Sequence, residues 1–211
     1  MLAFSLAAFS AVFSVVDPFG VVPVYLAMTV ADSREHRRRT AIRAAVAMFA
    51  TLALFAATGT FILRFFGVSL GAFRIAGGLL LFLLAVDMLR AQPSRQRTTP
   101  EEQAEGIEKP DVSIFPLAIP MLSGPGAVAT VMVLESRARG LAQHAAVYGA
   151  IGATAALTFG ILLGADLAER RMGRTGMNVL HRVMGLLLAA IAVQFVVDGA
   201  LEVLPALVRA G

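Results

Sequence analysis

The chain has no cysteine, which excludes disulfides, thiolate metal sites and a thiol redox relay. Charge is also scarce, because only 15% of the 211 residues are Asp, Glu, Lys or Arg, and these occur in a few clusters. A soluble globular protein spreads charge over its surface, so the composition argues against that class. The basic residues lie at the ends of apolar segments, where lipid headgroups account for them, and nucleic-acid binding is therefore not expected.

Six apolar segments make up most of the chain. They cover residues 4–30, 44–63, 71–89, 112–134, 145–165 and 179–201. Each is close to the ~20 residues that a helix needs to cross ~30 Å of hydrocarbon. Strands of a membrane barrel would be ~10 residues long with alternating polarity, and these segments show no such alternation. The sequence therefore predicts an all-α integral membrane protein with six transmembrane helices.

Basic residues are distributed unevenly between the two sides of such a protein. With six full spans, twelve Lys or Arg residues fall in the connections after segments one, three and five. The other side holds only Arg64, Arg137, Arg139 and Arg209. Because cytoplasmic loops carry the excess of basic residues, both termini of this multi-pass protein are predicted outside the cytoplasm. If segments one and four were re-entrant, the count would again be twelve to four, so that alternative stays open.

The two halves of the chain resemble one another at an offset of about 107 residues. Residues 17–22 align with 123–128, and residues 74–80 align with 182–188. With three spans in each half, the second half must insert upside down, which gives the inverted repeat common in secondary transporters. The predicted regions are a first three-helix repeat over 1–91, a cytoplasmic linker over 92–111 and a second three-helix repeat over 112–211.

The first apolar segment is interrupted in its middle. Asp17-Pro18 breaks the apolar run, and Gly20 and Pro23 follow before it resumes. Asp before Pro is typical of a helix start, because the carboxylate accepts from free N–H groups of the next turn and Pro at the first position loses no hydrogen bond. A second half-helix is therefore predicted to begin at Asp17. The interruption and the length also distinguish this segment from a secretory signal.

The fourth segment carries a related interruption. Its run Ser123-Gly124-Pro125-Gly126 stands where the repeat aligns Asp17. Ser123 is expected to cap a half-helix that has Pro125 in its first turn. Helices one and four are therefore both predicted to be discontinuous at mid-membrane.

Two such breaks would bring two helix N-termini together near the bilayer centre. Their unpaired N–H groups and roughly half a positive charge each would attract an anion. Unpaired backbone in hydrocarbon costs several kcal/mol per group, so a break persists only where it lines a cavity or a water path. Paired broken helices therefore indicate a transport site. Asp17, a carboxylate at this depth, is predicted to bind a substrate ammonium group or to carry a coupling proton.

Arg74 and Arg182 open the third and sixth segments at positions that align in the repeat. One interpretation is interfacial anchoring, and the other is contact with a carboxylate, either that of Asp17 or that of the substrate. The predicted substrate- or ion-binding residues are Asp17, Pro18, Gly20, Pro23, Ser123, Gly124, Pro125, Gly126, Arg74 and Arg182.

Two further patterns are interpreted structurally. The fifth segment has small residues every four positions, which predicts a face for close helix packing. These residues are Gly152, Ala156, Gly160 and Gly164. Four threonines within the segments are expected to bond to the backbone of their own helices. They are Thr58, Thr130, Thr154 and Thr158.

Residues 17–23 and 116–127 together resemble the MarC family of bacterial and archaeal inner-membrane proteins, and the similarity extends over essentially the whole chain, including the pattern at Arg74. The resemblance implies a six-helix protein classed with small neutral amino-acid transporters. It also implies, from some members, uptake of glycine or alanine driven by an ion gradient.

The leading hypothesis is a secondary transporter of a small neutral amino acid or a similar solute, coupled to H⁺ or Na⁺, with no cofactor, no metal site and no enzymatic activity. A zwitterion suits a site where helix N-termini hold a carboxylate and Asp17 holds an ammonium group. An exporter with the same site, an accessory permease subunit and an intramembrane hydrolase using Ser123 and His181 are the alternatives. The expected partners of the protein are the lipid bilayer and a small-molecule substrate. Whether copies of the chain associate with one another is left open by the sequence.

Overall fold

The computed structural model describes residues 1–30, 32–90 and 112–210, so the predicted linker over 92–111 lies outside the described residues. Every regular element in these ranges is helical, as the sequence predicts. The elements are α1 (Leu2–Val16), α2 (Pro18–Met28), α3 (Arg34–Phe65), α4 (Leu70–Leu89), η1 (Ser113–Leu122), α6 (Pro125–Arg137), α7 (Gly140–Leu163) and α8 (Ala165–Ala210).

Five helical stretches in the described ranges are long and apolar enough to cross a membrane. They are Leu2–Met28, Arg34–Phe65, Leu70–Leu89, Gly140–Leu163 and Asn178–Leu204. A sixth is obtained when η1 and α6, which bend by 62° at their junction, are taken as one span. The all-α architecture with five to six candidate spans is therefore confirmed, whereas the inverted repeat stays a prediction.

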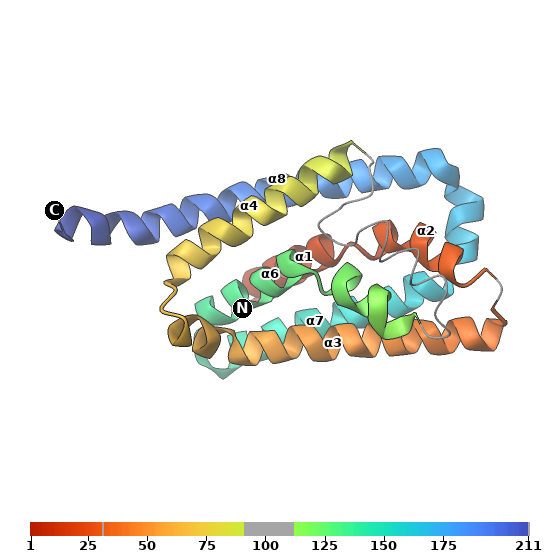
Figure 1. Ribbon diagram of the computed structural model, residues 1–211, viewed down its shortest axis with the longest axis horizontal. Coiled ribbons are helices and arrows are strands. Elements are labelled where there is room, and N and C mark those ends of the chain that lie inside the picture. Colours follow the sequence, from red (N-terminus) through yellow and green to blue (C-terminus); the bar gives the residue numbers. More distant parts are fainter. Residues whose placement is uncertain (31, 91–111, 211) are drawn as a thin grey trace.

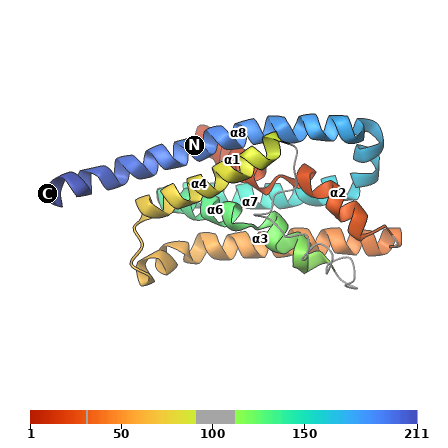
Figure 2. The ribbon, with the colours of Figure 1, turned by 45° about the horizontal axis from the view of Figure 1, so that its top comes forward.

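The helices form an elongated bundle in which they run back and forth along the long axis (Figure 1). The turns that join α3 to α4 and α6 to α7 lie toward the left end, and the connections from α2 to α3 and α7 to α8 lie toward the right. Figures 1 and 2 both place α4 beside α8, and α1 and α6 lie between this pair and the helices α3 and α7. The broken segments therefore occupy the interior of the bundle.

The α4–α8 pair has the most extensive contact in the bundle, and glycines make it close. A Cβ atom on Gly199 would lie 2.6 Å from the carbonyl oxygen of Gly71, and one on Gly78 would lie 2.8 Å from that of Ala192. Small residues allow helix backbones to approach in this way. Since α4 and α8 are antiparallel, this contact brings the start of α4 beside the end of α8.

The small-residue face predicted on the fifth segment does not make such a contact. A Cβ atom on Gly160 would meet nothing within 4 Å, and one on Gly152 would meet only Phe49 Cε2 at 3.7 Å. Ala156 is exposed. The prediction of a close helix contact within the chain is wrong here. Four-residue spacing shows that a face is smooth enough to pack closely, but it does not determine whether a neighbouring helix covers that face.

Two helices extend beyond the apolar segments that predicted them. The helix α3 begins ten residues before its apolar segment, because Ser33 Oγ caps it by accepting from the His36 N–H at 3.2 Å. The stretch between segments five and six is helical in α8, interrupted at Gly173, whose φ of 59° favours glycine.

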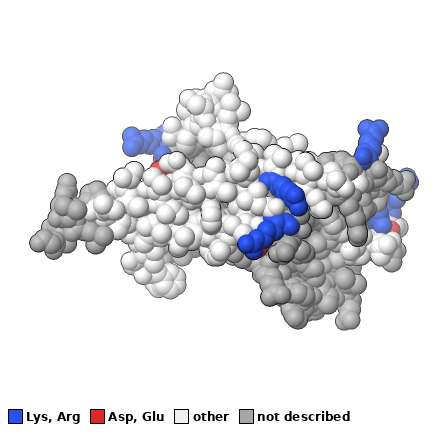
Figure 3. Space-filling view, turned by 90° about the horizontal axis from the view of Figure 1, so that it is seen from above, with Lys and Arg blue, Asp and Glu red and all other residues white. Residues whose placement is uncertain are grey.

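The surface of the bundle is mostly uncharged. Seen from above in Figure 3, Lys and Arg appear toward both ends and at one place between them. Large apolar side chains face outward along the helices, for example Leu186 with 64% and Leu79 with 55% of its surface exposed. Apolar side chains exposed along helices of this length suit a lipid environment.

Candidate functional site

The first helix break lies at a single residue, Asp17. The helix α1 ends at Val16, and Asp17 takes a left-handed conformation with φ 47° and ψ 67°. Its N–H closes α1 by donating to the Phe13 carbonyl at 2.9 Å. Its carboxylate then caps α2, because Oδ1 accepts from the Gly20 N–H at 3.3 Å, and Pro18 occupies the first helical position. The helix α2 therefore starts directly after Asp17.

The second break follows an irregular segment. Within η1, Phe115 and Ile119 have extended backbone angles, with φ of −123° and −129°. Each precedes a proline, Pro116 and Pro120, and the steric demand of the proline ring disfavours helical angles at the residue before it. Both X-Pro peptide bonds are cis. The chain becomes a regular helix only at Pro125, after the 62° bend.

Ser123 does not cap α6 as predicted. Gly124 occupies the N-cap position, and no side chain caps this helix. The Ser123 hydroxyl is buried, with the residue 5% exposed, and it has no hydrogen-bond partner among the described residues. The capping prediction failed because the helix starts one residue later than the repeat alignment implies. Ser123 therefore places a buried hydroxyl, free to form a hydrogen bond, beside the start of α6.

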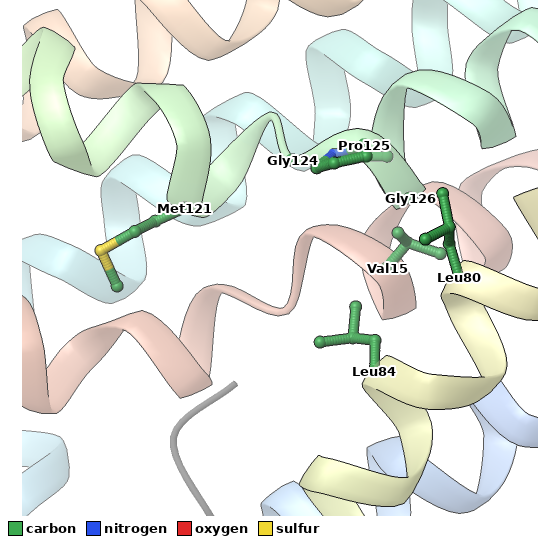
Figure 4. A pocket seen from close by; sticks show the side chains of 8 residues that line it. Val15, Leu80, Leu84, Met121, Gly124, Pro125 and Gly126 are labelled. Atoms are coloured by element: carbon green, nitrogen blue, oxygen red, sulfur yellow. The ribbon is translucent and has the colours of Figure 1, made fainter. Parts of the chain in front are cut away.

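The two breaks face one another across a small cavity. The helix α1 contacts α6 and α2 contacts η1, so the two interruptions lie side by side. Figure 4 shows the lining side chains between them, with α4 contributing to the wall. The cavity has a volume of about 200 Å³. Its lining residues are Val15, Leu80, Leu84, Met121, Gly124, Pro125, Gly126 and Ala127.

The walls of this cavity are apolar, but one side is the first turn of α6. The N–H groups of a helix's first turn have no intrahelical partners, and they carry the positive end of the helix dipole. Gly126 and Ala127 belong to this turn and line the cavity. Two of the glycines leave little room for a side chain, since a Cβ on Gly124 would lie 2.9 Å from the Pro120 carbonyl oxygen and one on Gly126 2.7 Å from Leu81 Cδ2.

Asp17 has a partner that the sequence did not suggest. His181 of α8 places Nδ1 3.4 Å from Asp17 Oδ2. Asp17 is fully buried, whereas the His181 side chain is 22% exposed. Gly20 makes room for the pair, because a Cβ there would lie 2.2 Å from Asp17 Oδ2 and 2.3 Å from His181 Cε1. The predicted candidates Asp17, Pro18 and Gly20 thus form one arrangement with His181.

The remaining predicted candidates lie elsewhere. Pro23 is exposed on the outer side of α2, and Arg182 is exposed on α8. Arg74 does reach a carboxylate, but it is that of Glu202 on α8, at 2.6 Å, rather than that of Asp17. The close α4–α8 contact explains this pairing, because it brings the start of α4 to the level of Glu202.

An ion-pair cluster forms around Arg74 at this end of the bundle. Arg137, the last residue of α6, pairs with Asp198 of α8, and Gln194 donates to the other Asp198 oxygen at 2.7 Å. The cluster therefore ties α4, α6 and α8 together, and α6 is the helix whose start lines the cavity.

Three of the four threonines bond to their own helix backbone as predicted. Thr58 donates to Leu54, Thr130 to Gly126 and Thr158 to Thr154, each at 2.7 or 2.8 Å. The exception is Thr154, whose hydroxyl is buried without a partner in the described part of the chain. Within that same part, no group of three or more His, Asp or Glu residues is arranged to hold a metal ion.

Comparison with known proteins identifies the family. Residues 2–204 match the model of the MarC family of integral membrane proteins. A membrane protein of Methanocaldococcus jannaschii is 39% identical over 198 residues, covering 94% of this chain and 96% of the relative. A Bacillus subtilis protein is 37% identical over 208 residues (98% and 99%), and one from Escherichia coli is 32% identical over 203 residues (95% and 94%).

These relatives are named only as UPF0056 membrane proteins. No solved structure matches the chain. The family match extends over nearly all of the chain and agrees with the multi-pass helical architecture. The chain therefore belongs to the MarC family of integral membrane proteins.

Proposed function

We propose that this protein is an ion-gradient-driven secondary transporter of a small neutral amino acid or a similar small solute. The observation that carries the proposal is the cavity of about 200 Å³ between the two helix breaks. Pockets for drug-sized ligands are roughly 300–1,000 Å³, so a cavity of this size suits a solute of only a few heavy atoms. Broken helices that meet at a cavity are typical of transporter binding sites.

The groups around the cavity suit the two ends of a zwitterion. The start of α6 offers N–H groups to a carboxylate, and the Ser123 hydroxyl, which has no partner among the described residues, lies just before it. Asp17 follows the lining residue Val15 by two positions, and in this proposal its carboxylate turns toward the cavity to hold an ammonium group. Because His181 already faces Asp17 Oδ2, a substrate ammonium group would have to replace the imidazole there. Asp17 would thus face His181 in the substrate-free state and the substrate ammonium group in the substrate-bound state.

The Asp17–His181 pair suggests how an ion gradient is coupled to solute transport. A carboxylate at the centre of a bilayer costs ~2.5–3.5 kcal/mol and marks proton or ion pathways in many transporters. Asp17 is fully buried and its partner His181 is partly exposed, so the pair joins the interior to the surface of the bundle. The coupling ion in this proposal is H⁺ passing through the pair, or Na⁺ held by Asp17 and nearby carbonyl groups.

We place the breaks at mid-membrane in six full spans, with both termini outside the cytoplasm. In Figure 1, α1 and α2 follow one another toward the right end, and η1 and α6 run in the opposite direction toward the left. Spans that continue in one direction through a break favour crossing over a re-entrant hairpin. The charge distribution supports this orientation, and the resemblance to inner-membrane proteins supports the inner (plasma) membrane. With it, the ion-pair cluster of Arg74, Arg137, Asp198 and Glu202 closes the non-cytoplasmic end.

Two alternatives share residues with this site. An exporter would use the same cavity, since direction depends on the gradients. A hydrolase would need a base within hydrogen-bond reach of Ser123. Ser123 has no hydrogen-bond partner in the described residues, and the His181 Nδ1 faces Asp17 instead, which favours transport over hydrolysis.

The direct test is uptake of labelled glycine, alanine and serine into proteoliposomes with an imposed proton or sodium gradient. We expect gradient-dependent accumulation of at least one of them by the wild type, and its loss in Asp17→Asn. Asp32→Asn is the matched control, because Asp32 lies outside the spans and pairs with His36 at 3.7 Å. The proposal would be contradicted if none of the amino acids accumulated under any gradient, in either direction across the membrane.

A further inference from the structure

A groove on the outside of the bundle runs between α3 and α7, away from the breaks. It has a volume of about 450 Å³. Ile42, Val46 and Phe49 of α3 form one wall, and Phe159 of α7 stands on the other. The small residues Gly152 and Ala156 form its floor, and no helix among the described residues packs closely on this face of α7.

One end of this apolar groove carries a cation. Arg38 is the sole charged residue among its lining residues. Its side chain has no ion pair or hydrogen bond in the described part of the chain. The two adjacent arginines are both engaged, because Arg39 pairs with Glu35 at 2.5 Å and Arg37 donates to the Thr29 carbonyl at 2.8 Å. Arg38 therefore stands at the mouth of the groove with its charge uncompensated.

The length of the groove corresponds to one leaflet. From Arg38 to Phe49 the helix α3 advances by eleven residues, or ~16 Å at 1.5 Å per residue. Half of a ~30 Å hydrocarbon core has the same length. Arg38 also belongs to the arginine-rich start of α3, on the side where basic residues predominate and anionic lipids are enriched.

We propose that this groove is a binding site for an anionic phospholipid. One acyl chain lies along Phe49, Val46 and Ile42 over the floor at Gly152, and the phosphate contacts the Arg38 guanidinium. A hydrocarbon chain satisfies the apolar walls, and the negative headgroup supplies the counter-charge that the described residues do not give Arg38.

The test compares phosphatidylglycerol with phosphatidylcholine on the purified, delipidated full-length protein. We expect the wild type to retain phosphatidylglycerol in native mass spectrometry, and its thermal unfolding midpoint to rise by several degrees more with this lipid than with phosphatidylcholine. Arg38→Gln should abolish that difference. Arg39→Gln is the matched control and should keep it, because Arg39 is the neighbouring and also exposed arginine, whose charge Glu35 already compensates.

A second variant fills the groove and leaves the charge in place. Gly152→Leu has room to fold, since its Cβ would meet only Phe49 Cε2 at 3.7 Å, and it should lower retention of phosphatidylglycerol. Equal responses of the wild type to the two lipids would overturn the proposal, as would an unchanged preference in Arg38→Gln. It would also be overturned if the wild type proved to be a dimer that Gly152→Leu separates without changing the lipid preference, because a second copy would then occupy the groove.

Discussion

Gly20 offers a sharp test of the arrangement at the first break, because a single methyl group there must disturb both partners of the Asp17–His181 pair. In Gly20→Ala the new Cβ would stand 2.2 Å from Asp17 Oδ2 and 2.3 Å from His181 Cε1. Ordinary contacts begin near 3.4 Å, so each group is overlapped by more than 1 Å. Asp17 is held by its capping bond to Gly20, and His181 therefore has to retreat, which separates the 3.4 Å pair.

The expected cost follows from two opposing effects. Overpacking of a filled interior costs about 1–3 kcal/mol, and replacing Gly by Ala within a helix returns up to about 1 kcal/mol. Gly20→Ala should therefore lower the free energy of unfolding by about 1–2 kcal/mol. Gly160→Ala is the matched control on α7, where a Cβ meets nothing within 4 Å, and it should raise that free energy by up to about 1 kcal/mol.

The assay measures the unfolding of both purified variants in detergent by chemical denaturation, together with amino-acid uptake in proteoliposomes. The two substitutions should shift stability in opposite directions, and only Gly20→Ala should impair uptake. If Gly20→Ala were as stable as Gly160→Ala and transported normally, Asp17 and His181 would not be packed as described, and the reasoning would be refuted.

The remaining predictions concern the second break, the helix pair and the ion-pair cluster. Ser123→Ala should leave the free energy of unfolding unchanged or raise it by about 1 kcal/mol, because it removes a buried hydroxyl that has no partner among the described residues. It should also raise the substrate concentration for half-maximal uptake, and unchanged uptake kinetics would show that Ser123 is not part of the site. Gly199→Leu should lower the unfolding midpoint strongly, at a cost of about 3 kcal/mol, because a backbone oxygen lies 2.6 Å from its Cβ position, and a wild-type midpoint would argue against the close α4–α8 contact. Arg137→Gln and Asp198→Asn should each cost about 1 kcal/mol and be non-additive in a double-mutant cycle, whereas simple additivity would show that the pair is not coupled.

Much of the fold follows from local patterns in the sequence. Runs of about 20 apolar residues predicted the helices, and Asp17-Pro18 predicted both the cap and the start of α2, because those signals act within one turn. The N-terminal parts of α3 and α8 were not predicted to be helical, because their polar residues carry no apolar periodicity. Ser33 before α3 was the capping signal that could have extended that helix.

Contacts between distant residues were not predictable in the same way. The Asp17–His181 pair joins α1–α2 to α8, and a single sequence carries no signal that relates these two positions. Gly20 was selected as a break residue, although its role in making room for the imidazole depends on that distant contact. Similarly, glycine spacing predicted a packing face on α7, whereas the contact formed between α4 and α8, since spacing describes one surface and packing requires two.

Solute binding between the two breaks can be measured directly because the chain has no cysteine of its own. In Ser123→Cys the single thiol would lie at the second break, and its reaction with a small thiol reagent can be followed with and without the transported amino acid. Ser69→Cys, an exposed position at the start of α4, is the control. The account predicts that the amino acid slows the reaction of the Ser123→Cys thiol and leaves that of Ser69→Cys unchanged. Equal rates at Ser123→Cys with and without a solute that the variant still transports would contradict it.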